Sequence, residues 1–425
     1  PEAILDLCHL DEAAQAAVLA RVDRMAAGGL RVLAVAKAAF PGPPWPEQAH
    51  DFAFSLLGLV GFMDPVREGV PAAMAESRAA GMRVIMITGD YPATARHIAR
   101  QAGIEDGEPV TGDELAALPP TELAARMRTA RICARVAPEQ KLAIVRALKD
   151  DGEIVTMTGD GVNDAPALRA AHVGVAMGKR GTDVARQAAS LVLLDDSFAS
   201  LVEAVRRGRH IFANMQKALA YIVSVHVPTA AMALVPVLLG WPVLLYPVHI
   251  VFLELLIDPT CALAFENEPA EPKLMRQPPR PPSAPVLSRA ALAVSVLQGV
   301  VAAATVALAY GWAQQALPDG QARSFGFAAL VCADVALIFV NRSTGLTSIE
   351  TLLTPNRILW LVCGGAFAVL AAALYLPLLA ELFRFGPLAP AQFALACTLG
   401  LSCMLWFDAA KLVRRGRDRL AARRA

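Results

Sequence analysis

Two aspartates in one short stretch have the residue type and spacing for metal and phosphate chemistry. Residues 157–168 read MTGDGVNDAPAL, with Asp160 and Asp164 four positions apart. The stretch follows a strand-like run at 153–157 and opens a helical pattern, which predicts a glycine-hinged turn between a strand and a helix. On such a turn the carboxylates can bind Mg²⁺ while backbone N–H groups face a phosphate. We therefore expect a magnesium site, with an ordinary acidic turn as the alternative.

The elements that must position this turn belong to an α/β pattern. Runs typical of strands alternate with helical patterns, which predicts a doubly wound, mostly parallel sheet. Predicted strands are 54–61, 82–88, 131–136, 153–157, 173–176 and 190–194, and predicted helices include 70–80, 91–102, 138–149 and 164–171. A proline-rich stretch at 41–46 predicts a linker. In such sheets ligands bind outside the carboxyl ends of the strands, where both Thr-Gly-Asp turns (88–90 and 158–160) are expected.

Composition separates this α/β part from an apolar remainder. Of the 425 residues 56% are hydrophobic, and the net charge is +1. A membrane-spanning helix needs roughly 20 apolar residues. Six runs qualify as predicted spans of a lipid bilayer, namely 218–240, 243–265, 290–311, 325–341, 358–380 and 387–407. No basic-aromatic pattern indicates nucleic-acid binding, and seven scattered cysteines favour free thiols.

Four segments together resemble the P-type ATPases, ion pumps that phosphorylate themselves on an aspartate. They are Asp64-Pro65-Val66-Arg67, Thr88-Gly89-Asp90, the stretch 134–141 and the stretch 157–168. The resemblance covers nearly the whole chain. It implies a remnant of the nucleotide-binding domain at 1–50, a haloacid-dehalogenase-like phosphorylation domain with its stalk at 51–213, and a six-helix transmembrane domain at 214–425.

The resemblance also assigns roles to residues. It implies that Thr88 and Gly89 hold the phosphoryl group and that Lys141 contacts it, with ATP and Mg²⁺ as cofactors. The candidate catalytic residues are Thr88, Gly89, Asp90, Lys141, Asn163 and Asp164. The candidate magnesium ligands are Asp160 and Asp164, and the candidate cofactor-binding residues are Arg67 and Arg135.

One part of the family pattern is missing. The family's nucleophile lies in an Asp-Lys-Thr-Gly-Thr string, which this sequence lacks. The opening Pro1-Glu2-Ala3 looks like the continuation of a Lys-Gly-Ala-Pro-Glu segment of the family. We therefore expect a carboxyl-terminal fragment whose nucleophile lies upstream. The alternatives are a phosphatase domain on a membrane anchor and a non-catalytic membrane protein that retains the domain.

The second predicted span indicates the transported ion. Glu254 and Asp258 share one helix face, since they are four residues apart, and intramembrane acids usually line an ion path or pair internally in a structural role. Pro259 frees carbonyl oxygens, and Thr229 lies where the preceding helix of calcium pumps offers a ligand. Six spans also argue against the heavy-metal pumps of the family, which have only two spans after the phosphorylation domain. Ca²⁺ is the expected cargo, with H⁺, Na⁺/K⁺ and Mg²⁺/Mn²⁺ as alternatives.

Charged connections predict the orientation in the membrane. If the six spans alternate, most lysines and arginines between them fall on one side, together with the soluble part and the basic segment 411–424. The positive-inside rule places that side in the cytoplasm. We expect an integral protein of a bacterial plasma membrane with a cytoplasmic soluble domain. The sequence leaves any protein partners unknown.

Overall fold

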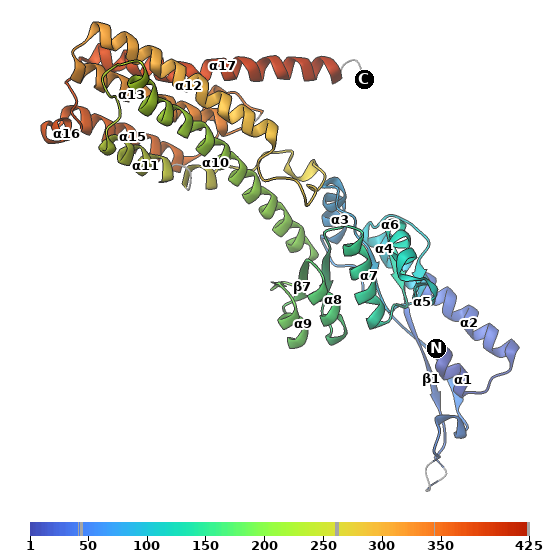
Figure 1. Cartoon of the computed structure of the whole chain (residues 1–425). Helices are drawn as coiled ribbons and strands as arrows, with labels where there is room; N and C mark the ends of the chain where they lie inside the picture. The colour runs from blue at the N-terminus through green and yellow to red at the C-terminus, as the bar shows by residue number, and fades with distance from the viewer. Residues whose placement is uncertain (41, 43–45, 260–262, 344, 423–425) are drawn as a thin grey trace. The chain divides into compact units, whose positions relative to one another are not determined.

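The chain divides into two compact units in the computed structural model (Figure 1). The structure describes residues 1–425 apart from 41, 43–45, 260–262, 344 and 423–425, and leaves out the side chains of 120, 256–259, 414 and 418–422. The first unit comprises 1–206 with 273–282, and the second 207–272 with 283–425. The predicted linker at 41–46 lies mostly outside the described residues. The three-domain division stays a prediction.

Two small parallel sheets form the centre of the first unit. Their strand orders are β3-β5-β4 and β6-β7-β8. The strands are β3 (Met86–Ile87), β4 (Val110–Thr111), β5 (Ile132–Ala134), β6 (Thr156–Gly159), β7 (Val173–Met177) and β8 (Leu191–Leu193). The predicted α/β fold class is confirmed. Strand β4 was not predicted and β3 is shorter than the run 82–88, because ladders of two residues carry no readable periodicity.

Helices connect these strands, and one of them joins the two sheets. They are α3 (Val70–Ala79), α4 (Pro92–Ala102), α5 (Gly112–Ala117), α6 (Pro120–Thr129), α7 (Pro138–Asp150), α8 (Ala165–Ala170) and α9 (Asp183–Ala188). Helix α7 begins at a proline, which suits the first helical position because its missing N–H needs no partner. Its Ile144 and Leu148 pack in the core around β4 and β5, and its Val145 packs beside Met157 of β6. Helix α7 is thereby held between the cores of both sheets.

The predicted strand at 54–61 joins neither parallel sheet. It appears as β2 (Ser55–Phe62), which pairs antiparallel with β1 (Arg31–Lys37). Helices α1 (Glu2–Leu7) and α2 (Glu12–Ala27) precede this ribbon, and the one-turn helix η1 (Ala49–Asp51) lies between its strands. An antiparallel pair needs no crossover helix, and none lies between these two strands in the described residues.

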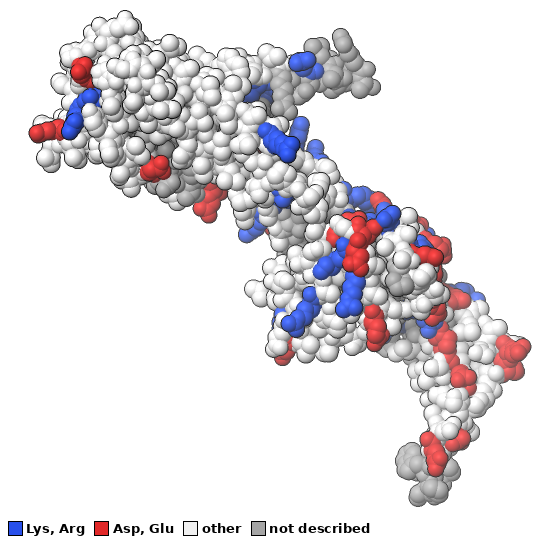
Figure 2. Space-filling model, in the orientation of Figure 1, with Lys and Arg blue, Asp and Glu red and all other residues white. Residues whose placement is uncertain are grey.

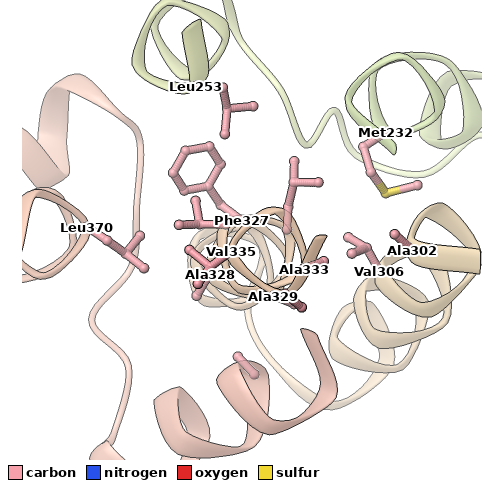
Figure 3. Packing of buried hydrophobic residues seen from close by; sticks show 14 of the residues in the cluster. Met232, Leu253, Ala302, Val306, Phe327, Ala328, Ala329, Ala333, Val335 and Leu370 are labelled. Atoms are coloured by element: carbon pink, nitrogen blue, oxygen red, sulfur yellow. The ribbon is translucent and has the colours of Figure 1, made fainter. Parts of the chain in front are cut away.

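The second unit is a helical bundle built around α13. Its helices are α10 (Phe198–Leu238, which begins in the first unit), α11 (Pro247–Pro259), α12 (Arg289–Ala316), α13 (Asp319–Asn341), α14 (Ser348–Leu352), α15 (Arg357–Tyr375), α16 (Pro377–Leu382) and α17 (Pro390–Ala422). Figure 3 shows α13 surrounded by side chains of other helices, among them Met232, Leu253, Val306 and Leu370. Small residues such as Ala328, Ala329 and Ala333 let these neighbours approach closely.

Five described helices are long and apolar enough to cross a bilayer. They are α10, α12, α13, α15 and α17, with α17 counted over residues 390–417. Figure 2 agrees, since charged side chains are spread over the first unit while the visible face of the second is mostly white. The chain is an integral membrane protein. The remaining predicted span, 243–265, contains α11 with 13 residues and includes residues 260–262, which lie outside the described residues, so the count of six stays a prediction.

Candidate functional site

One buried carboxylate organises the turn that follows β6, residues 158–164, here called the aspartate turn. Asp164 ends the one-turn helix η2 (Val162–Asp164) and is 6% exposed. Its Oδ2 accepts hydrogen bonds from the N–H groups of Asp160 at 3.3 Å and Gly161 at 3.1 Å. Its Oδ1 accepts one from Nζ of Lys141, in the first turn of α7, at 2.7 Å. Glycine is required at 159, because a Cβ there would lie 2.6 Å from the Cβ of Asp164.

The side chain of Asp160 is free although its backbone is fixed. Its carbonyl oxygen accepts a hydrogen bond at 2.9 Å from the N–H of Thr182, the residue that precedes α9. Its carboxylate is exposed and has no hydrogen bond or ion pair with the described residues, and the same holds for the amide of Asn163. Free carboxylate oxygens on a held backbone are what a hard cation needs as ligands. The structure therefore separates an engaged aspartate, Asp164, from an available one.

Mg²⁺ suits this donor set. Within the part of the chain that the structure describes, no cluster of three or more His, Cys, Asp or Glu side chains could hold a metal by itself. Magnesium is usually held by one or two carboxylates, with water and phosphate oxygens completing its six ligands. The carboxylate of Asp160 meets that requirement. A direct bond from Asp164 to the metal stays a prediction.

The second Thr-Gly-Asp turn follows β3 and is tied to the end of β5. Thr88 Oγ1 accepts the N–H of Asp90 at 3.1 Å. The carbonyls of Thr88 and Asp90 accept the N–H groups of Val136 and Arg135, each at 3.1 Å. Arg135 has φ +54°, a left-handed conformation that is costly for a residue with a Cβ and persists where neighbouring bonds impose it. Both Thr-Gly-Asp turns thus lie at the carboxyl ends of parallel strands.

Cys133, in β5 beside this second turn, is a packing residue. Its side chain is fully buried in the core with Val110 and Ile144. Burial raises the pKa of the thiol to about 11. A thiol that stays protonated at neutral pH is a poor nucleophile, so Cys133 does not replace the missing aspartate.

Both candidate cofactor-binding arginines have partners within the protein. Arg135 pairs with Glu2, Nη1 to Oε1 at 3.0 Å, and its guanidinium lies 5.3 Å from the ring centre of Tyr91. Arg67 donates a hydrogen bond to the carbonyl of Asp196. Neither arginine contacts the aspartate turn within the described residues. Their role in binding a nucleotide stays a prediction.

The predicted ion residues lie on α10 and α11. Thr229 Oγ1 donates to the carbonyl of Val225 at 3.1 Å, one turn earlier in α10. Glu254 of α11 is half-buried, and its Oε1 lies 3.7 Å from Nε2 of His226 on α10. The side chain of Asp258 lies outside the described residues. His226 was not among the predicted ion residues, although an ionisable residue inside an apolar run is a signal for such a site.

Comparisons with known proteins agree with both units. Residues 15–172 match the model of haloacid dehalogenase-like hydrolases, and residues 242–413 match the model of the carboxyl terminus of cation-transporting ATPases. The probable cation-transporting ATPase F of Mycobacterium tuberculosis is 34% identical over 91% of this chain and 45% of its own length.

Two similar proteins have calcium in their names. Calcium-transporting ATPase 1 of Bacillus cereus is 41% identical over 64% of this chain and 31% of its own length. The calcium-transporting ATPase of Bacillus subtilis is 34% identical over 90% of this chain and 43% of its own length. The chain therefore spans less than half the length of these curated relatives.

Proposed function

The chain belongs to the cation-transporting P-type ATPases, and from this premise we propose that it forms the phosphorylation and transport parts of an ATP-driven cation pump. One observation carries the proposal: the aspartate turn holds both the buried Asp164, which pairs with Lys141 of α7, and the carboxylate of Asp160, which has no partner in the described residues. The pump works through an aspartyl-phosphate. Its nucleophile lies outside these 425 residues, since no Asp-Lys-Thr-Gly-Thr string is present. The names of the relatives support ATP as the energy source.

In this proposal the residues of the first unit position a phosphoryl group. Phosphoryl transfer spreads negative charge over three oxygens, so catalysis is mainly placement and electrostatic stabilisation. Lys141 supplies a positive charge, and the hydroxyl of Thr88 and the amide of Gly89 supply hydrogen-bond donors, because the amides of Thr88 and Asp90 are already bonded within the protein. Asp164 orients Lys141 and the amides of the aspartate turn. Asp160 holds Mg²⁺, which when bound neutralises phosphate charge.

We propose Ca²⁺ as the transported ion. Glu254, Asp258 and Thr229 offer oxygen ligands, which hard cations prefer, and two of the relatives carry calcium in their names. H⁺ is the second candidate because of one contact, the 3.7 Å approach of His226 to Glu254. A histidine beside a carboxylate can exchange protons near neutral pH.

We also propose that the first unit and the carboxyl terminus face the cytoplasm of a bacterial plasma membrane. A reporter fused after Arg417 is expected to be cytoplasmic, and one inserted beside Asp319, between α12 and α13, is expected to be outside. Labelling with a membrane-impermeant reagent, before and after permeabilisation, measures both positions. A cytoplasmic reporter at Asp319 contradicts this orientation.

Phosphorylation tests the function itself. The full-length protein in membranes, given ATP labelled on the γ-phosphate together with Mg²⁺ and Ca²⁺, is expected to acquire an acid-stable label that hydroxylamine removes. That pattern distinguishes an acyl phosphate from phosphoserine or phosphothreonine. A protein that hydrolyses phosphate esters without becoming labelled would instead support the phosphatase alternative.

A further inference from the structure

Asp196, just after β8, uses its whole side chain to hold a loop. It is 5% exposed, and its Oδ1 and Oδ2 accept the N–H groups of Lys179 at 2.9 Å and Arg180 at 3.1 Å. The Lys179 bond is the main cause that lowers the pKa of this carboxyl below its usual value, so it is charged at neutral pH. Its φ of +56° is left-handed, which aspartate and asparagine tolerate better than most residues.

The loop it holds, residues 178–182, reaches the candidate magnesium ligand. Thr182 at its end donates its N–H to the carbonyl of Asp160 at 2.9 Å. Arg186 donates to the carbonyls of Gly178 at 2.9 Å and Gly181 at 2.7 Å. Gly181 has no room for a side chain, since a Cβ there would lie 1.9 Å from the carbonyl oxygen of Met177. The loop therefore has one tightly packed conformation, which fixes the backbone of Asp160 from one side.

The backbone of Asp196 faces a different segment. Its carbonyl oxygen accepts a hydrogen bond from the guanidinium of Arg67. Arg67 lies in the connection between β2 and α3, within the Asp-Pro-x-Arg stretch that resembles a hinge. One residue thus bonds the connection that carries Arg67 and the loop that supports Asp160.

We propose that Asp196 is a positioning residue, which sets the backbone of the magnesium ligand Asp160 through the loop 178–182. The inference rests on the proposed function, because it presumes that Asp160 binds Mg²⁺ during phosphorylation. Residues that orient a metal ligand typically change metal affinity by about 10- to 100-fold when they are replaced. Loss of the Asp196 charge is therefore expected to weaken Mg²⁺ binding while the ligand itself is unchanged.

Asp196→Asn in the full-length protein tests this proposal. Asparagine tolerates the left-handed backbone but accepts with one oxygen and carries no charge. The Mg²⁺ concentration for half-maximal phosphorylation by ATP is expected to rise about tenfold, with the maximal level largely kept. Asp195→Asn is the matched control. Among the described residues its exposed carboxylate bonds only the N–H of Ser197 and the hydroxyl of Ser200, so half-saturation is expected to stay within about twofold of wild type.

A second measurement does not depend on activity. Amide hydrogen exchange of residues 178–182, without nucleotide or Mg²⁺, is expected to speed up at least about tenfold in Asp196→Asn and to stay unchanged in Asp195→Asn. Unchanged exchange overturns the proposal. Faster exchange with an unchanged Mg²⁺ concentration for half-maximal phosphorylation also overturns the proposal, because Asp196 then stabilises the loop without affecting Mg²⁺ binding. A wild-type protein that is never phosphorylated refutes the proposed function instead, and the exchange result still reports whether Asp196 holds the loop.

Discussion

Replacement of Asp160 by asparagine is expected to lower phosphorylation of the full-length protein by ATP by at least about 100-fold at saturating Mg²⁺. The carboxylate is exposed and free of partners in the described residues, so the substitution breaks no bond of the folded protein. What it removes is the negative charge that binds the metal. The labelled phosphoenzyme, counted per mole of protein recovered in membranes, measures the effect.

Asp183→Asn is the matched control for this variant. Asp183 begins α9 in the same unit and has a largely exposed side chain, and its one ion pair in the described part of the chain is with Arg186 of the same helix. The control makes the same change of charge and is expected to leave the phosphoenzyme level within about twofold of wild type. A wild-type level in Asp160→Asn would remove Asp160 from the metal site and would leave Asp164 as the ligand to examine.

Replacement of Glu254 by glutamine is expected to raise the Ca²⁺ concentration that half-activates ATP hydrolysis by at least about tenfold, which corresponds to about 1.4 kcal/mol of binding free energy. Glu254 is the acid of α11 whose side chain the structure describes. The negative charge of a carboxylate inside a membrane span is costly unless a bound cation or a proton neutralises it. Phosphorylation from inorganic phosphate, which does not need the transported ion, is expected to be retained. Both activities are measured on the same membranes.

Glu266→Gln provides the control, since Glu266 is an exposed acid in the same unit that lies beyond α11. Hydrolysis measured against pH with chelator present separates the two candidate ions. If H⁺ is the cargo, activity persists in chelator and follows pH, and His226→Gln shifts that profile because His226 faces Glu254. Full Ca²⁺-dependent turnover in Glu254→Gln would leave this residue with a structural role only.

Local sequence signals predicted much of the first unit. The stretch 157–168 and its flanking residues predicted a strand, a glycine turn and a helix. In the structure β6, η2 and α8 follow one another there. Helices α3, α4 and α7 lie within one residue of their predicted ranges, since apolar periodicity and proline at a helix start are properties of neighbouring residues. Five of the six predicted apolar runs likewise lie in helices with the length and composition of spans.

The partners of the functional side chains were decided by the tertiary structure. By sequence both Asp160 and Asp164 are candidate magnesium ligands, but in the fold Asp164 is engaged by Lys141 and two amides while the carboxylate of Asp160 has no partner in the described residues. Nothing in the spacing of the two aspartates distinguishes them. The distinction comes from α7, which packs between two cores and thereby brings Lys141 to one aspartate.

The sequence by itself determined the α/β class, the apolar helices and the motif that indicates phosphoryl chemistry, because each depends on residues close together in the chain. Only the tertiary structure decided that Arg67 bonds Asp196, 129 positions away, and that His226 faces Glu254. Such contacts are made when separate elements pack against one another. Their energies depend on distance and burial, which residue order alone does not specify.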